Sequence, residues 1–227
     1  MSYTIEVYFG NQKAEKDFSV FALYVLYFPQ LVAGPIERPQ NLLHQFRRMG
    51  VPDNQTIRSG LFLIFTGLAK KCIVADNLTI LSDKVFSNPQ AFGTLAHFLG
   101  TLFFAFQIYC DFAGYSDIAR GCSKFFGIEL MLNFNKPYFA KTVSEFWRRW
   151  HLSLSTWFRD YVYFPLGGNR NSQYRTIFNS LVVFTLSGLW HGANWTFIFW
   201  GLFHGLVVGL EHLLKKSDSR LWTIMLV

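Results

Sequence analysis

Residues 176–214 read TIFNSLVVFTLSGLWHGANWTFIFWGLFHGLVVGLEHLL. Two apolar runs, 176–189 and 195–214, flank a short break in which Gly192 disfavours a continuous helix. The length and hydrophobicity of the two runs predict a pair of helices that lie in a lipid bilayer. An ionisable side chain in a bilayer is costly unless it is paired or faces a cavity. His191, which lies in the break, is therefore the first candidate for a functional residue.

The composition of the whole chain is typical of a membrane protein. Of its 227 residues, 51% are hydrophobic, 19% are aromatic and only 15% are charged, which is well below the charged share of ordinary soluble domains. The 26 Phe and 7 Trp residues suit rings that lie among lipid tails and headgroups. The net charge of +7 comes from basic residues beside apolar runs. It fits anionic lipid headgroups or a phosphate-bearing donor better than nucleic acid, so we expect no nucleic-acid partner.

The remainder of the chain predicts further helices of unequal length. Residues 91–110 form an apolar run of about 20 residues, which is enough to cross a bilayer core of about 30 Å. The runs 18–33 and 60–69 are shorter, because Pro29 interrupts the first and a pair of lysines closes the second. They suit re-entrant or tilted elements. We therefore expect an all-α, polytopic membrane protein with spanning, re-entrant and interfacial helices, organised as a single domain over residues 1–227.

One more helix is predicted from about residue 143 to 163. Thr142 and Glu145 form a capping-box pattern at its start, and the Pro-Leu-Gly-Gly turn at 165–168 stops it. Aromatic rings recur along it at steps of three and four residues, while its arginines lie toward other faces, which indicates a helix at the membrane interface or along a protein interior. Basic residues outnumber acidic ones from 120 to 175, so the positive-inside rule favours the cytoplasmic side for this segment.

The signatures of several enzyme classes are missing from the sequence. Cys72, Cys110 and Cys122 show neither a disulfide framework nor the spacing of a zinc site. The string GYSDI at 114–118 begins like a nucleophile elbow but lacks the closing glycine. The chain also has no Walker A loop, no HExxH and no dinucleotide fingerprint. We expect neither a metal site nor a covalent serine intermediate.

Four motifs, taken in order, resemble one known family. They are LVAGPIERP at 31–39, QIYCDFAGYSD at 107–117, FWRRWHLSLSTWFRDYVY at 146–163 followed by PLGG, and LWHG at 189–192. Together they resemble the membrane-bound O-acyltransferase family, and within it the bacterial branch that O-acetylates alginate. The resemblance covers nearly the whole chain and implies a multi-pass protein of the bacterial inner membrane. Family members are longer at both ends, so we expect this chain to be a central-to-C-terminal part of the family core.

The resemblance also implies a reaction and two catalytic residues. Moving an acyl group from a thioester to a sugar hydroxyl requires removal of a proton from an alcohol, and a neutral imidazole is a suitable general base near neutral pH. The motif at 189–192 is similar to the segment with the family's catalytic histidine, which assigns this role to His191. By the same analogy His151 lies near it and orients donor or acceptor or stabilises the tetrahedral oxyanion.

Other residues of these motifs are expected along the substrate and donor passage. Arginines could pair with the phosphates of a coenzyme A or phosphopantetheine donor, and Lys141 could join them. The passage residues we expect are Trp190, Asn194, Trp195, Trp147, Arg148, Arg149, Arg159 and Asp111. Asp111 and Asp117 can equally be paired or capping groups that hold a cavity wall. His44, His97, His204 and His212 are expected to be structural.

The resemblance sets the expected partners, and two alternatives stay open. We expect no bound cofactor. The donor substrate would be acetyl-CoA or another acyl thioester, and the partners would be the bilayer and periplasmic or extracellular proteins of polysaccharide acetylation. One alternative is a transporter or channel-like subunit, in which the histidines of the membrane relay protons or line a path. The other is a non-catalytic fragment of the acyltransferase, which has the motifs but does not assemble.

Overall fold

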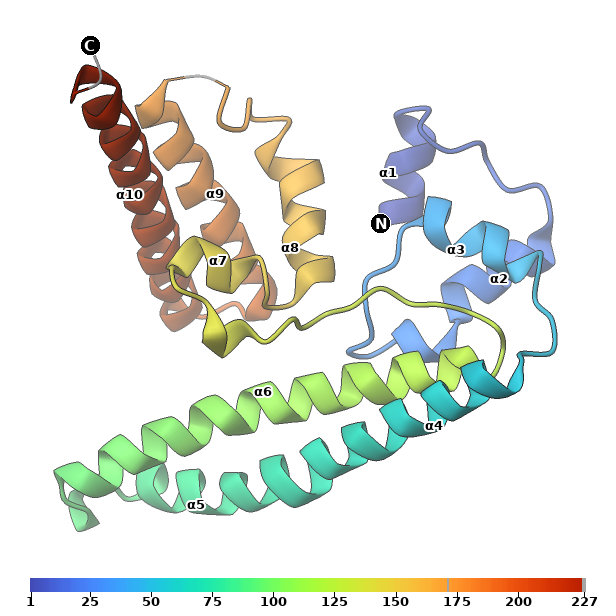
Figure 1. Cartoon of the computed structure of the whole chain (residues 1–227), viewed down its shortest axis with the longest axis horizontal. Helices are drawn as coiled ribbons and strands as arrows, with labels where there is room; N and C mark the ends of the chain where they lie inside the picture. Colours follow the sequence, from blue (N-terminus) through green and yellow to red (C-terminus); the bar gives the residue numbers. More distant parts are fainter. Residues whose placement is uncertain (171, 226–227) are drawn as a thin grey trace. The chain divides into compact units, whose positions relative to one another are not determined.

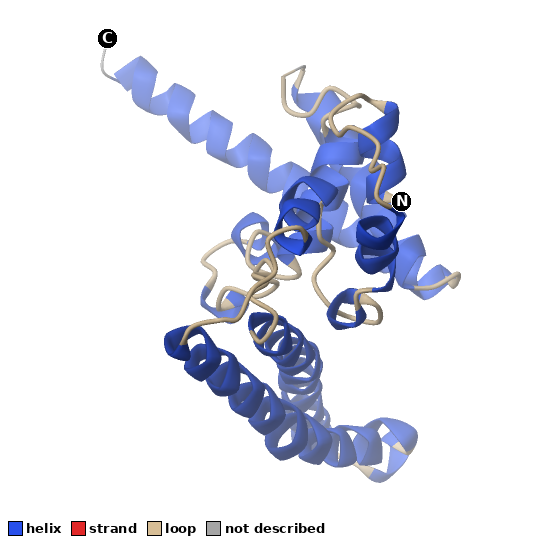
Figure 2. Ribbon diagram, turned by 90° about the vertical axis from the view of Figure 1, so that its right-hand side faces the viewer, coloured by secondary structure: helices blue, strands red, loops and turns tan. Residues whose placement is uncertain are grey.

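The computed structural model describes residues 1–170 and 172–225. Within these residues all regular structure is helical and there is no β-strand, which confirms the predicted all-α class (Figures 1 and 2). The chain divides into two compact units, Met1–Asn133 and Phe134–Val227. We describe each unit by itself.

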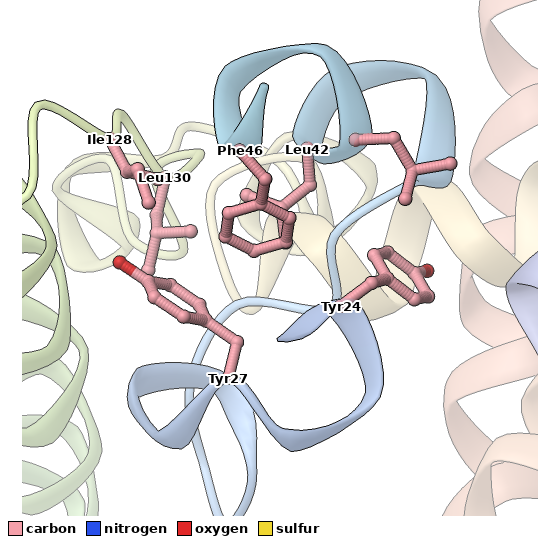
Figure 3. Packing of buried hydrophobic residues seen from close by; sticks show 7 residues of the cluster. Tyr24, Tyr27, Leu42, Phe46, Ile128 and Leu130 are labelled. Atoms are coloured by element: carbon pink, nitrogen blue, oxygen red, sulfur yellow. The ribbon is translucent and has the colours of Figure 1, made fainter. Parts of the chain in front are cut away.

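The first unit begins with short helices around an apolar core. These helices are α1 (Ser2–Tyr8), α2 (Phe18–Leu26), the 3-10 turn η1 (Phe28–Gln30) and α3 (Pro39–Phe46). The interruption predicted at Pro29 is present, since α2 ends before it and Pro29 lies in η1. Figure 3 shows how aromatic and aliphatic side chains from separate segments meet here. The core consists of Tyr24, Tyr27, Leu42, Leu43, Phe46, Ile128 and Leu130.

A long helical hairpin forms the rest of the first unit. Its first arm runs through α4 (Asn54–Leu68), the π-helical turn η2 (Ala69–Ala75) and α5 (Asp76–Ser87). After the turn η3 (Pro89–Ala91), α6 (Thr94–Lys124) returns along it. Figure 1 shows the two arms side by side.

Two predicted helix ends in this hairpin were wrong. Lys70 and Lys71 do not close the first run, and the span predicted at 91–110 continues to Lys124. Both corrections have the same physical cause. The ammonium of Lys70 lies 2.5 Å from Asp117 on α6, and that of Lys71 lies 2.7 Å from Asp111. Because the charges of each arm neutralise those of the other, neither arm has to stop where its charges begin.

The second unit holds the remaining helices. They are the 3-10 turn η4 (Pro137–Phe139), α7 (Val143–Trp147), α8 (Leu152–Phe158), the π-helical turn η5 (Arg159–Tyr163), α9 (Gln173–His191) and α10 (Trp195–Met225). Figure 1 shows α9 and α10 packed as an antiparallel hairpin. The break predicted in the first quoted stretch is present, because α9 ends at His191 and α10 starts at Trp195.

The continuous helix predicted from 143 to 163 is wrong. The segment is divided into α7, α8 and η5, and the chain turns at residues 148–151. The backbone of His151 has φ 43° and ψ 58°, which is the left-handed region. A residue in that conformation cannot continue a right-handed helix, so the helix breaks here. The spacing of the aromatic residues nevertheless continues across the two short helices, which is why the sequence predicted a single one.

Among the described residues, two helices are long and apolar enough to cross a bilayer, judged by length and composition: Thr94–Lys124 and Trp195–Leu214. The run predicted at 176–189 is helical as part of α9, but α9 does not meet the same measure. Large apolar side chains stand exposed along both candidate spans. They include Leu95, Phe98, Phe104, Phe106, Phe199 and Phe203. This exposure is what lipid-facing helices require.

Glycines set the distance between the arms of the first hairpin. A Cβ placed on Gly67 would lie 2.6 Å from the carbonyl oxygen of Gly114, and one on Gly114 would lie 2.7 Å from that of Gly67. Backbones that pass this closely exclude any side chain, as in membrane helix pairs joined by small residues.

We expect Gly67→Ala and Gly114→Ala each to destabilise the chain by about 1–3 kcal/mol, because overpacking outweighs the usual gain from alanine in a helix. The check is the melting temperature of detergent-solubilised protein. Gly50→Ala is the matched control, since the nearest atom to its added Cβ is 3.9 Å away. Equal melting temperatures for Gly67→Ala, Gly50→Ala and the parent would show that the arms do not pack as described.

Candidate functional site

A cavity of about 510 Å³ lies in the second unit. Residues of α7, α8, η5, α9 and α10 line it, so it lies where the short helices meet the long hairpin. His151 and His191 are both in its wall. The two histidines come from segments 40 residues apart, and the fold brings them to one cavity.

His151 precedes α8 and is held in an unusual backbone conformation. Its φ of 43° is one of only two positive values among the described non-glycine residues. Such a conformation costs of order 1–3 kcal/mol and persists only where the surroundings enforce it. The Asn135 backbone N–H donates to the carbonyl of Arg149 at 2.9 Å. The Ser155 hydroxyl is 3.2 Å from the carbonyl of Trp147 and 3.1 Å from that of Trp150. These bonds hold the turn from both sides.

His151 is a neutral base inside the protein. Its residue is 4% exposed, and it lies outside both candidate spans. Burial, and to a smaller extent the nearby imidazole of His191, lowers the pKa of His151 to about 3. A neutral imidazole offers one N–H donor and one acceptor nitrogen.

His191 has a different environment from His151. It is the last residue of α9 and is exposed, with aromatic rings on several sides. Its ring centroid is 4.9 Å from that of Trp190, 5.5 Å from that of Trp200 and 6.4 Å from that of Phe197. Gly192 follows it because a Cβ there would lie 2.5 Å from the Phe197 ring. The site thus pairs a buried imidazole with an accessible one.

An aromatic group links the two histidines to the core of the hairpin. Trp190 contacts His151 at a centroid distance of 6.1 Å, as well as His191. Trp147 packs against Trp200 at 5.5 Å and against His204 at 5.1 Å. His204 was expected to be structural, and these contacts place it against the cavity wall. Trp147 Nε1 and His204 Nδ1 are buried and have no hydrogen-bond partner among the described residues.

The structure gathers some of the expected passage residues and separates others. Trp147, Arg148 and Arg159 line the cavity together with the two histidines. Arg149 is outside the lining and pairs with Glu145 at 2.5 Å. Arg159 also contacts Asp160, with Nε 2.8 Å from the carboxylate.

The residues after His191 form the start of α10. The Asn194 side chain accepts the backbone N–H of Thr196 at 3.1 Å and its hydroxyl at 3.2 Å, so Asn194 caps the helix. Trp195 is exposed and packs on Phe199 at 6.3 Å. Neither Asn194 nor Trp195 is in the cavity lining, so their part in a passage stays a prediction.

Asp111 belongs to the first unit and is not in the lining of this cavity. It lies on α6, paired with Lys71, while Asp117 is paired with Lys70 and lies 3.8 Å from Arg120. The geometry is therefore that of paired carboxylates in a helical hairpin. Among the described residues, no group of three or more His, Cys, Asp or Glu could hold a metal ion.

The sequence motifs did not indicate two residues that belong to the site or hold it. Ser144 lines the cavity, and Glu211 accepts its backbone N–H and its hydroxyl. A signal for Glu211 was present, since a carboxylate inside an otherwise apolar run needs a partner. Its position did not reveal which partner it has.

The described residues thus form an all-helical fold with two candidate membrane spans and two histidines at one cavity, which are features of a membrane protein with an internal site. Comparison with known proteins gives the family. Residues 14–222 match the model of the membrane-bound O-acyltransferase family, and the chain belongs to this family.

Three relatives show the range of named activities. A probable alginate O-acetylase of Azotobacter vinelandii is 44% identical over 95% of this chain and 43% of its own length. A peptidoglycan O-acetyltransferase of Helicobacter pylori is 42% identical over 88% of this chain and 38% of its own length. A teichoic acid D-alanyltransferase of Bacillus subtilis is 29% identical over 87% of this chain and 52% of its own length. The chain thus spans about half or less of these relatives.

The pKa of His151 leads to a prediction about acid stability. The unfolded chain binds a proton at this residue below its ordinary pKa of about 6.5, whereas the folded chain stays neutral down to a pKa of about 3. The unfolding free energy should therefore fall as the pH drops below about 6.5, by at most about 1.4 kcal/mol per pH unit from this one group.

Melting temperatures of the parent and of His151→Gln, measured from about pH 7 to about pH 5, check this. The parent should lose stability more steeply than His151→Gln, because glutamine does not titrate. Parallel pH profiles would mean that His151 is already solvated or charged in the folded protein.

Proposed function

We propose that this chain carries the catalytic centre of a membrane O-acetyltransferase that moves an acetyl group from a cytoplasmic thioester donor toward hydroxyls of an exported polysaccharide such as alginate. The observation that carries the proposal is the presence of His151 and His191 in the wall of one cavity of about 510 Å³. The names of the relatives support it, since acyl transfer to a cell-surface polymer is common to all three.

The two imidazoles divide the chemistry between them. His191 is accessible and takes the proton of the acceptor hydroxyl as the oxygen of that hydroxyl attacks the thioester carbonyl. The C–O bond forms and a tetrahedral oxyanion results. The C–S bond then breaks, and the proton held by His191 passes to the leaving thiolate. His151, neutral and buried, donates its N–H to the oxyanion.

The expected donor accounts for the charges in the cavity wall. Arg148 and Arg159 bring guanidinium groups to a cavity that is otherwise mainly apolar and aromatic. Such groups bind phosphates with charge-assisted, often bidentate hydrogen bonds, which fits the phosphates of acetyl-CoA or of a carrier-bound phosphopantetheine. Trp190 is outside the cavity lining but contacts both histidines. Asn194 and Trp195 lie at the following turn and would border the acceptor side.

The proposed setting follows from the same features. The basic segment around η5 would face the cytoplasm, and the chain would be a multi-pass component of the bacterial inner membrane. The acetyl group would then pass to periplasmic or extracellular acetylation proteins that act on the polymer. The 44% and 42% identities to alginate and peptidoglycan relatives support a glycan acceptor. We choose alginate because its O-acetylases supply more of the similar proteins.

The test is the O-acetyl content of exported polysaccharide in a deletion strain that expresses this chain. His191→Ala should lower acetylation by at least about 100-fold and His151→Ala by a comparable factor, because each removes a group that acts on the reacting atoms. His97→Ala is the matched control. Its side chain is half-buried near the start of α6, where Nδ1 contacts the carbonyl of Gly93 at 3.0 Å.

The alternatives give different results in the same strain. A transporter or channel-like subunit would leave acyl transfer unchanged in His191→Ala membranes supplied with donor. A non-catalytic fragment would fail to restore acetylation although it is stably inserted, while a full-length relative succeeds. Acetylation restored by the parent and retained by His191→Ala would refute the proposed role of His191.

The arginine assignment gives a separate prediction. We expect Arg148→Ala and Arg159→Ala each to raise the apparent KM for an acyl-CoA donor by about tenfold, from the loss of charge-assisted hydrogen bonds to phosphate. Lysine at either position should restore only part of the affinity. The control is Arg175→Ala, whose guanidinium lies over the Phe178 ring at 5.3 Å and is not in the cavity lining. An unchanged KM for Arg148→Ala and Arg159→Ala would place the donor phosphates elsewhere.

A further inference from the structure

Glu211 is a carboxylate in α10 that follows an apolar stretch and precedes His212. It lies inside the candidate span Trp195–Leu214, where an ionisable group is costly unless a partner satisfies it. Its Oε2 accepts the backbone N–H of Ser144 at 2.8 Å and the Ser144 hydroxyl at 3.0 Å. Ser144 is the second residue of α7 and lines the cavity. The carboxylate therefore joins α10 to the start of the short helix.

The other end of α7 rests on the same face of α10. Trp147, its last residue, contacts the rings of Trp200 and His204. Trp200, His204 and Glu211 follow one another at steps of four and seven residues, which places them on one face of the helix. A helix of five residues is not stable by itself. It therefore depends on this polar contact at one end and the aromatic contact at the other.

Bonds inside the segment do not tie it to α10. The Thr142 hydroxyl accepts the Glu145 backbone N–H at 3.1 Å, and Glu145 accepts the Lys141 backbone N–H at 2.8 Å. Both contacts would survive if α7 moved as a unit. His151 lies four residues after the end of α7, so a displacement of α7 would move the imidazole of His151 relative to His191 on α9.

We propose that Glu211 is a positioning residue, which fixes α7 against α10 through Ser144 and so holds His151 in register with His191. This inference rests on the proposed function of the two histidines. In this role Glu211 needs a side chain long enough to reach Ser144 and one oxygen that accepts hydrogen bonds, because both bonds from Ser144 end on the same carboxylate oxygen. The side-chain carbonyl of a glutamine can accept both of them.

Two conservative variants distinguish the length of the Glu211 side chain from its negative charge. Glu211→Gln keeps the length and one acceptor oxygen but removes the charge. Glu211→Asp keeps the charge but is shorter by one methylene, so it does not reach Ser144 without moving α7. We expect Glu211→Gln to retain O-acetyl transfer within about threefold of the parent. Glu211→Asp should lose about 10- to 100-fold, the usual consequence of misplacing a catalytic group by about 1 Å.

The measurement is O-acetyl transfer by membranes that contain the whole chain, normalised to the amount of inserted protein, with melting temperatures taken alongside. Asp83→Asn is the control, because Asp83 is an exposed carboxylate on α5. Coupling to the partner is tested by Ser144→Ala. If Glu211 acts through Ser144, adding Ser144→Ala to the Glu211→Asp variant should lower O-acetyl transfer by a smaller factor than Ser144→Ala does in the parent.

Each other result overturns the inference. Equal losses in Glu211→Gln and Glu211→Asp, or a larger loss in Glu211→Gln, would mean that the charge itself is needed. Full activity of both variants would mean that α7 does not depend on Glu211. Additive losses with Ser144→Ala would mean that the two residues act separately. His191→Ala, measured in the same membranes, reports on the proposed function alone, so failure of that function is distinguishable from failure of this inference.

Discussion

The left-handed backbone at His151 is the constraint around which the second unit is organised. A residue in this conformation ends one helix direction and starts another, and here it turns an imidazole toward a cavity that the α9–α10 hairpin closes. The surrounding structure must supply the free energy that the conformation costs. Hydrogen bonds from Asn135 and Ser155 fasten the turn, and Glu211 fastens the helix before it. These contacts hold the segments on both sides of His151.

The two units solve the same electrostatic problem in different ways. In the hairpin of the first unit, Lys70 and Lys71 on one arm face Asp117 and Asp111 on the other, so whole charges cancel. In the second unit the carboxylate of Glu211 accepts the backbone N–H and the hydroxyl of Ser144. The attraction between two opposite charges depends only weakly on their relative orientation, so ion pairs can hold long helices together without fixing a precise geometry. Hydrogen bonds to a backbone are directional, which suits a contact that must position a short helix.

The sequence predicted the features that local pattern encodes. The break after His191 follows from glycine in an apolar run, and the meeting of His151 with His191 followed from the resemblance of their motifs to one family. The passage of α4 into α5 could not be predicted, because it depends on carboxylates that lie some 40 residues away on α6. The break at 148–151 was missed because aromatic spacing continues through it. A left-handed backbone conformation at one residue does not change the spacing of apolar residues along the sequence.

The π-helical turn at Ala69–Ala75 lies between two stretches that both face α6. Before it, Gly67 meets Gly114, and after it the Ser82 hydroxyl donates to the Gln107 side chain at 2.9 Å. A π turn holds one residue more than a regular helix would. Because the turn absorbs that extra residue, deleting a single residue there would restore an ordinary helix while Gly67 and Ser82 keep facing α6. The arm can therefore lose one residue at this turn without losing its register against α6.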